Sequence, residues 1–118
     1  MSTQNDRLPM PMVPDWPGRK AGDAGHDRIA ALIVLDIQNA PQWARRVLGE
    51  VEDVMSGASS GWEMVMNAHI LTVGKTCCEI AASHDGPEEG ACEDSISVQT
   101  GDLKAALVAW IAKMDRDA

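Results

Sequence analysis

The spacing of apolar residues changes several times along the chain, and the first clear pattern begins at Arg28. From there to Asp36 the sequence reads RIAALIVLD, a short and uniformly apolar run that is rich in β-branched residues. Such a run lacks the regularly spaced polar positions of a surface helix. It therefore predicts a central strand that is buried on both sides.

A helical period follows this run. Asn39 or its neighbour is a suitable cap, Pro41 suits a first helical turn, and apolar residues then recur at helical spacing at Trp43, Val47, Val51 and Val54. The pattern predicts a helix over residues 40–56, which the turn residues 57–61 bring to an end.

A hairpin is predicted next. Residues 62–73 have a strand-like composition, and Gly74 and Lys75 offer a turn into a second strand over residues 76–82. Successive side chains of a strand point to opposite faces, so we expect Cys77 and Cys78 to lie on opposite faces of the sheet. We expect Cys78, which shares its face with Ile80, to lie in the core.

The last two elements complete the predicted fold. Ile96 and Val98 alternate with polar residues, which predicts a strand over Ser95–Gln99. Thr100 is a good N-cap for a final helix whose apolar stripe comprises Leu103, Leu107, Trp110, Ile111 and Met114. The order of elements predicts an α+β fold, a small antiparallel or mixed β-sheet with two helices packed on one face.

The N-terminal residues 1–27 show no stable apolar period. They contain four prolines between positions 9 and 17 and a small, polar run after them. This composition predicts a mobile arm over residues 1–27, followed by a single α+β domain over residues 28–118. The alternative is that Met10, Met12, Val13 and Trp16 dock a short segment onto the domain.

Composition indicates a cytoplasmic protein. Phe and Tyr are absent, so four Trp, seven Met and aliphatic residues must build the core. The longest apolar run, residues 29–35, is much shorter than the roughly 20 residues that span a bilayer, and the N-terminus lacks the pattern of a secretory signal. Three cysteines do not make the disulfide framework of a small secreted domain. We expect reduced thiols and no membrane association.

Negative charge is concentrated in the second half of the chain. The net charge is −8, and residues 48–118 hold thirteen acidic residues against four basic ones. Such a surface repels nucleic acid and attracts basic proteins, although a charged loop is more often just a solvated loop. The candidate partner-binding residues are Asp85, Glu88, Glu89, Glu93 and Asp94 in the densest stretch, together with Glu50 and Asp53.

No motif specifies a catalytic, metal or cofactor site. Cys77, Cys78, His84 and Cys92 are the right types for zinc, but no CxxC pair occurs and adjacent strand residues diverge. The GASSG segment at 57–61 fits GxSxG in letters only, because it leads from a helix into a strand. For His69 we expect the ordinary role of a hydrogen-bonded structural histidine. The sequence therefore predicts no enzymatic activity, no metal and no cofactor.

The segment GWEMVMNAHILTV at residues 61–73, followed by a strand, an acidic loop, a short strand and a Trp-containing helix, resembles two groups of small bacterial proteins. One is the YacL-like group. The other is the immunity proteins of contact-dependent growth inhibition and related polymorphic toxin systems. The second resemblance implies a protein that binds and neutralises a cognate toxin.

We therefore expect an immunity-type protein that covers the active site of a basic nuclease toxin with acidic residues. A nuclease active site is positively charged because it holds phosphate, so a carboxylate-rich surface complements it. The alternative is a structural or regulatory domain that self-associates through its strand edges into a homodimer and has no enzymatic activity.

Overall fold

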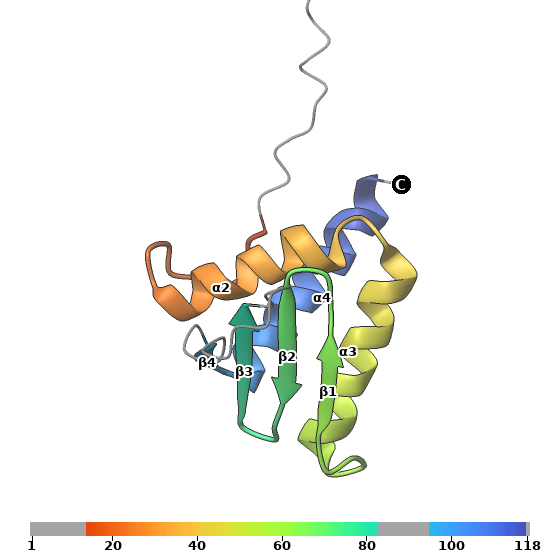
Figure 1. The fold of residues 1–118 in the computed structure, drawn as a ribbon. Helices are drawn as coiled ribbons and strands as arrows, with labels where there is room; N and C mark the ends of the chain where they lie inside the picture. The colour runs from red at the N-terminus through yellow and green to blue at the C-terminus, as the bar shows by residue number, and fades with distance from the viewer. Residues whose placement is uncertain (1–13, 83–94, 118) are drawn as a thin grey trace, which may run out of the picture.

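The computed structural model describes residues 14–82 and 95–117, and the α+β class is confirmed (Figure 1). The described chain forms three α-helices, a π-helical segment and four strands, in this order: α2 (Ala24–Leu32), η1 (Ile33–Ile37), α3 (Pro41–Ser56), β1 (Trp62–Val65), β2 (His69–Val73), β3 (Cys77–Ala82), β4 (Ser95–Gln99) and α4 (Thr100–Asp117). Among these residues no helix is both long enough and apolar enough to cross a bilayer.

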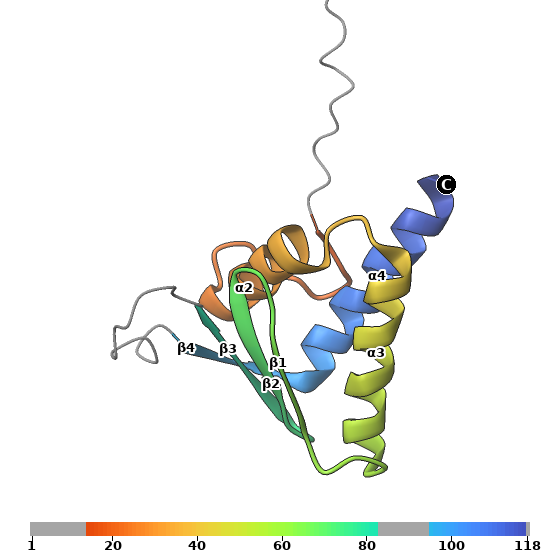
Figure 2. The ribbon, with the colours of Figure 1, turned by 45° about the vertical axis from the view of Figure 1, so that its right-hand side comes forward.

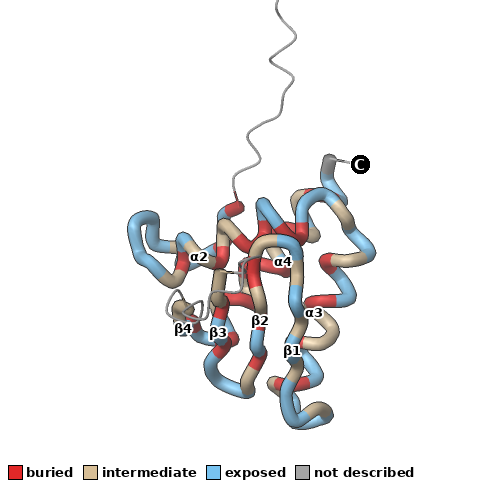
Figure 3. The backbone as a smooth tube through the Cα atoms, viewed as in Figure 1, coloured by how far each residue is buried: buried red, intermediate tan, exposed pale blue. Residues whose placement is uncertain are grey.

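The four strands form one antiparallel sheet in the order β1-β2-β3-β4. The register places Leu71 opposite Ile80 and Val73 opposite Cys78, so these side chains share the inner face of the sheet. Figure 2 shows α3 and α4 on one side of the sheet, with α2 crossing its upper end. Buried and exposed residues alternate along β2, as Figure 3 shows, because only one face of the sheet is covered.

The core lies between the inner face of the sheet and the three helices. From α3 it takes Val47, Val51 and Val54, and from α4 it takes Leu103 and Leu107, all with at most 1% of their surface exposed. The periodicity of both helices is thereby confirmed. The last strand and the inward direction of Cys78 are confirmed as well.

The strand predicted over residues 28–36 is wrong, because this run is helical. The carboxylate of Asp23 accepts a hydrogen bond from the backbone N–H of His26 and caps α2. Ile29, Leu32, Ile33 and Ile37 are all buried, so the helix is apolar over a wide face. A short apolar run has the same pattern in a buried helix as in a central strand, and the preceding cap decides between them.

The π-helical segment η1 ends at Gln38, whose φ of 58° is in the left-handed region. The side chain of Gln38 donates to the carbonyl of Leu35, and the backbone carbonyl of Gln38 accepts from Nε1 of Trp110 at 2.8 Å. These contacts hold the unusual backbone in place between η1 and α3.

The mobile arm predicted over residues 1–27 is wrong for residues 14–27. Trp16 is only 4% exposed, and α2 begins at Ala24, four residues before the predicted domain boundary. The structure shows the alternative instead: Trp16 is docked into the core of the domain. Residues 1–13 lie outside the described part of the chain.

The strand predicted over residues 62–73 is two strands. A turn separates β1 from β2, and in it the backbone N–H of Met66 donates to the carbonyl of His69 at 2.8 Å. The next turn lies at Gly74, as predicted. There the N–H of Gly74 donates to the carbonyl of Cys77 at 2.9 Å.

Candidate protein-interaction site

The outer face of the sheet is not covered by any described helix. The register aligns two rows of side chains across it. The polar row contains Glu63, Thr72, Glu79 and Ser97, and the second row contains Val65, Ile70, Ala81 and Ser95. We call this surface, made of these eight residues, the open face.

The centre of the open face is slightly hollowed. The hollow has a volume of about 260 Å³, and Ile70, Thr72 and Ala81 lie in its floor. Glu63 and Glu79 are the neighbours of Thr72 on either side. Adjacent strands are about 4.8 Å apart, so the two carboxylates flank the hollow at about twice that spacing.

The electrostatics of the open face are negative. Its described residues include two carboxylates and no Lys or Arg. The hydroxyl of Ser95 donates to Oε1 of Glu79 at 3.4 Å, whereas Glu63 has no side-chain hydrogen bond to another described residue. Lys75 lies in the β2–β3 turn at the end of the sheet and does not belong to either row.

The two described residues that flank the predicted acidic loop line the hollow. Ala82 is the last residue of β3 and Ser95 the first of β4, and both line the hollow. The candidates Asp85, Glu88, Glu89, Glu93 and Asp94 lie between them, outside the described residues. The described residues on either side of this segment, Ala82 and Ser95, therefore lie at the edge of the open face.

The remaining two candidates lie elsewhere. Glu50 and Asp53 belong to α3, which packs against the inner side of the sheet. Oε2 of Glu50 accepts from Nε of Arg46 at 3.2 Å, and Asp53 is exposed. The structure does not bring Glu50 or Asp53 to the face that carries Glu63 and Glu79.

His69 has the structural role predicted for it. Its Nδ1–H donates to Oδ2 of Asp36 at 2.7 Å, and the backbone N–H of Ala68 donates to Oδ1 of the same carboxylate at 2.6 Å. Both side chains are buried, at 7% and 0% exposed. An Asp–His pair can orient a catalytic base, but the described residues place no nucleophile in hydrogen-bond contact with this histidine. The pair ties η1 to β2.

Cys77 and Cys78 lie on opposite faces of the sheet, as the sequence predicts. Cys77 is exposed and Cys78 buried, so they point to opposite faces. The S–H of Cys78 donates to Oγ1 of Thr100 at 3.3 Å, because the Thr100 hydroxyl itself donates to the carbonyl of Gly74. Burial raises the pKa of the Cys78 thiol, because desolvation disfavours the thiolate. Within residues 14–82 and 95–117, no cluster of His, Cys, Asp and Glu is arranged to hold a metal.

Sequence reasoning missed Glu63 and Glu79 as site residues. Each occupies a polar position in an alternating strand, which marks it as outward-facing but not as part of a site. They are sixteen positions apart, and only the antiparallel order β1-β2-β3 brings them to either side of Thr72. No family model, curated protein or solved structure matches this chain.

Proposed function

We propose that this chain is an immunity-type protein that binds a basic nuclease toxin and covers its active site. The observation that carries the proposal is the position of the acidic residues. The open face bears Glu63 and Glu79, and none of its eight residues is a Lys or Arg. In the sequence, the acidic stretch 83–94 lies between Ala82 and Ser95, which both line the hollow. The resemblance of residues 60–115 to immunity proteins points in the same direction.

The open face has the physical properties that such an inhibitor needs. It is backed by Leu71 and Ile80, which are fully buried, so its carboxylates project from a rigid support. Ile70 and Ala81 supply an apolar centre, and Thr72 supplies a hydrogen-bonding hydroxyl. Carboxylates around such a centre steer a basic partner towards the surface and fix its orientation.

The proposal is tested with the toxin expected in the reading frame directly upstream of the gene for this chain. Glu63→Gln/Glu79→Gln and a loop variant with Glu88, Glu89, Glu93 and Asp94 changed to their amides remove charge from the proposed surface. Glu52→Gln/Asp115→Asn is the matched control, because it removes two charges from α3 and α4. Binding is measured by calorimetry at low and high salt, and neutralisation by growth of cells that express the toxin.

We expect the open-face and loop variants each to weaken binding about tenfold or more at low salt, since each removes complementary charges from the contact. The control variant should bind within about twofold of the unmodified chain, because exposed ion pairs contribute little. If both acidic variants still bind and neutralise as the control does, the open face is not the inhibitory surface. Glu50→Gln/Asp53→Asn tests the two helix candidates separately.

Self-association is a second candidate function, favoured by one observation. Val65, at the end of the edge strand β1, is 66% exposed, and an exposed apolar edge can pair with a second copy. Sedimentation at low and high salt distinguishes the two functions. A stable, salt-insensitive homodimer that Val65→Lys dissociates favours self-association, whereas a monomer that tightens onto a basic protein at low salt favours the inhibitor.

A further inference from the structure

A groove runs along the side of α4 that faces away from the sheet. The segment Asp15–Pro17 forms one wall, and α4 from Gly101 to Arg116 forms the floor and the other wall. The groove has a volume of about 890 Å³, several times that of the hollow on the open face. At a rise of 1.5 Å per residue its length is about 22 Å, or four helical turns. We call it the α4 groove.

The floor of the α4 groove is apolar and built from small side chains. Ala105 and Ala109 are half-buried, and Ala112 is exposed. Val108, in the middle of this row, is 46% exposed. These residues lie on the side of α4 opposite to Leu103 and Leu107. Ala105 and Ala109 pack partly against the core, whereas Val108 and Ala112 are exposed, so this side of α4 keeps an exposed apolar strip.

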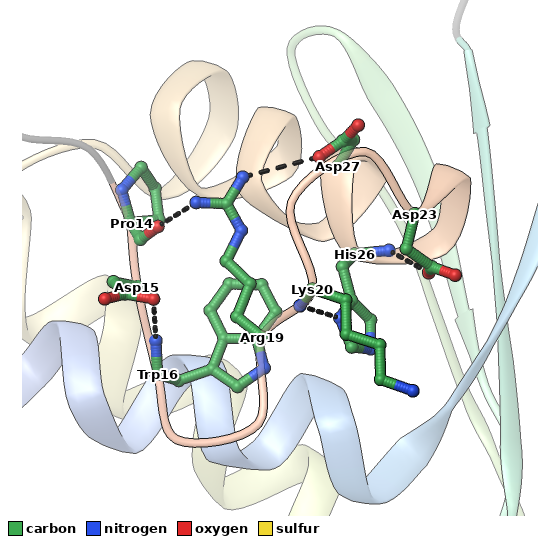
Figure 4. Close-up of polar contacts among 8 residues, drawn as sticks. All are labelled: Pro14, Asp15, Trp16, Arg19, Lys20, Asp23, His26 and Asp27. Atoms are coloured by element: carbon green, nitrogen blue, oxygen red, sulfur yellow. Dashed lines mark hydrogen bonds and ion pairs between the residues drawn. The ribbon is translucent and has the colours of Figure 1, made fainter.

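Polar contacts hold the wall formed by the N-terminal segment, as Figure 4 shows. The guanidinium of Arg19 lies 5.5 Å from the ring centre of Trp16 and donates to the carbonyl of Pro14 at 2.8 Å. Nδ1 of His26 accepts from the N–H of Lys20 at 2.8 Å, and its Nε2–H donates to Asp102 on α4 at 3.1 Å. The groove is therefore preformed and does not require a rearrangement of this wall.

The residues that line the α4 groove include three cations and one carboxylate, Asp15, so the groove is net positive although the chain has a net charge of −8. Residues 48–118 contain four basic residues, and three of them, Lys104, Lys113 and Arg116, line this groove. Lys104 lies 3.7 Å from Glu52, whereas Lys113 and Arg116 form no ion pair with another described residue. Two cations at the α4 end of the groove are thus available to a ligand.

One buried donor beside the groove also lacks a partner. Nε1–H of Trp16 is buried and donates to no acceptor among the described residues. Trp16 is 4% exposed and lines the groove. Buried polar groups in folded proteins are nearly always hydrogen-bonded, so this donor, like Nε of Arg19, is an exception among the described residues.

We propose that the α4 groove binds an amphipathic, acidic helix of a partner protein. The small side chains of the floor allow a helix to approach α4 closely, and the groove is long enough for about four of its turns. The carboxylates of such a helix pair with Lys113 and Arg116, and its apolar side chains cover Val108. This site is distinct from the open face of the sheet and does not depend on the proposed function.

Other occupants fit the groove less well. Nucleic acid does not require an apolar floor and is repelled by the net negative charge of the chain. A membrane surface is bound by protruding apolar side chains, whereas these residues line a concavity. The acidic stretch of a second copy, SHDGPEEGACED, contains Gly and Pro and lacks apolar residues at helical spacing.

The test uses the full chain and fluorescently labelled 16-residue peptides with Leu and Ala on one helical face and Glu on both flanks. A second set of peptides has Lys in place of every Glu. Lys113→Glu/Arg116→Glu reverses the rim charge, and Val108→Asp places a charge in the floor. Lys75→Glu, in the β2–β3 turn, is the control for a change in net charge. Thermal unfolding confirms that each variant is folded.

We expect the Glu peptides to bind and the Lys peptides to bind about tenfold more weakly or not at all. Lys113→Glu/Arg116→Glu and Val108→Asp should each weaken binding at least about tenfold, with Lys75→Glu within about twofold of the unmodified chain. The Nε1–H resonance of Trp16 should shift on binding. Equal binding of both peptide sets, no binding of either, or an unchanged affinity of both groove variants overturns the proposal. A homodimer that Val108→Asp dissociates also overturns it.

Discussion

Nδ1 of His69 lies 2.7 Å from Oδ2 of Asp36, and the two side chains join elements that are far apart in the chain. Asp36 belongs to the π-helical segment and His69 to the first position of β2. Because the Ala68 N–H donates to the other carboxylate oxygen, Asp36 satisfies two buried donors at once. The pair determines how the helical layer joins the end of the sheet.

We predict that Asp36→Ala lowers the free energy of unfolding by about 3 kcal/mol, because it leaves two buried donors without an acceptor. Asp115→Ala removes an exposed carboxylate that accepts from Arg45 at 2.8 Å, and its cost should be below about 1 kcal/mol. Urea unfolding of both variants provides the measurement. Equal losses for the two variants would contradict the role assigned to Asp36.

We predict that Trp16→Ala destabilises the fold by about 3 to 5 kcal/mol, the range for removing a buried aromatic side chain. Its indole packs against His26 and Arg19, with ring centres of Trp16 and His26 5.6 Å apart. Pro17→Ala, at an exposed neighbouring position, is the control and should change stability little. If the Trp16→Ala variant is as stable as the Pro17→Ala variant, Trp16 does not contribute to the core, and residues 14–17 behave as the mobile arm predicted from sequence.

We predict that Cys78 makes stability depend on pH in the alkaline range. Burial raises the pKa of its thiol in the folded state above the ordinary value of 9.0. The unfolded chain therefore loses the proton first, so this contribution is complete below pH 9.0 and is lost as pH rises through the folded-state pKa.

The measurement for Cys78 is urea unfolding between pH 7.5 and 10 in a Cys77→Ser background, with and without Cys78→Ala. The background variant should lose more stability over this range than the variant that also lacks Cys78. Parallel pH profiles would rule out the predicted linkage. The Cys78→Ala change itself lowers stability at every pH, and only the difference in slope bears on the prediction.

We predict opposite effects of the same substitution at the two glycines of α3. Gly49 lies inside the helix with open space where a Cβ would be, so Gly49→Ala should raise the free energy of unfolding by up to about 1 kcal/mol. Gly57 caps the helix with a φ of 90°, so Gly57→Ala should lower it by about 1 kcal/mol. Thermal unfolding of both variants tests the pair, and changes of the same sign would be inconsistent with this backbone.

The sequence was sufficient to predict a helix or strand where the signal that decides it lies within a few neighbouring residues. Trp43 to Val54 and Leu103 to Met114 recur at helical spacing, and Pro41, Gly57 and Thr100 mark where their helices begin or end. Alternation predicted a strand over Ser95–Gln99 and placed Cys78 on the buried face of its own strand. Spacing, caps and alternation act over a few residues, so they can be read without a partner.

The run Ile29 to Ile37 is apolar enough for either a strand or a buried helix, and the Asp23 cap before it, also a local signal, is what marks the helix. Tertiary structure alone decided the contacts between distant residues. Glu63 and Glu79 came together only through strand pairing, and Trp16 meets α4 only because the N-terminal segment folds back over it. Such contacts join residues far apart in the chain, and their free energy depends on surfaces that a local pattern does not contain.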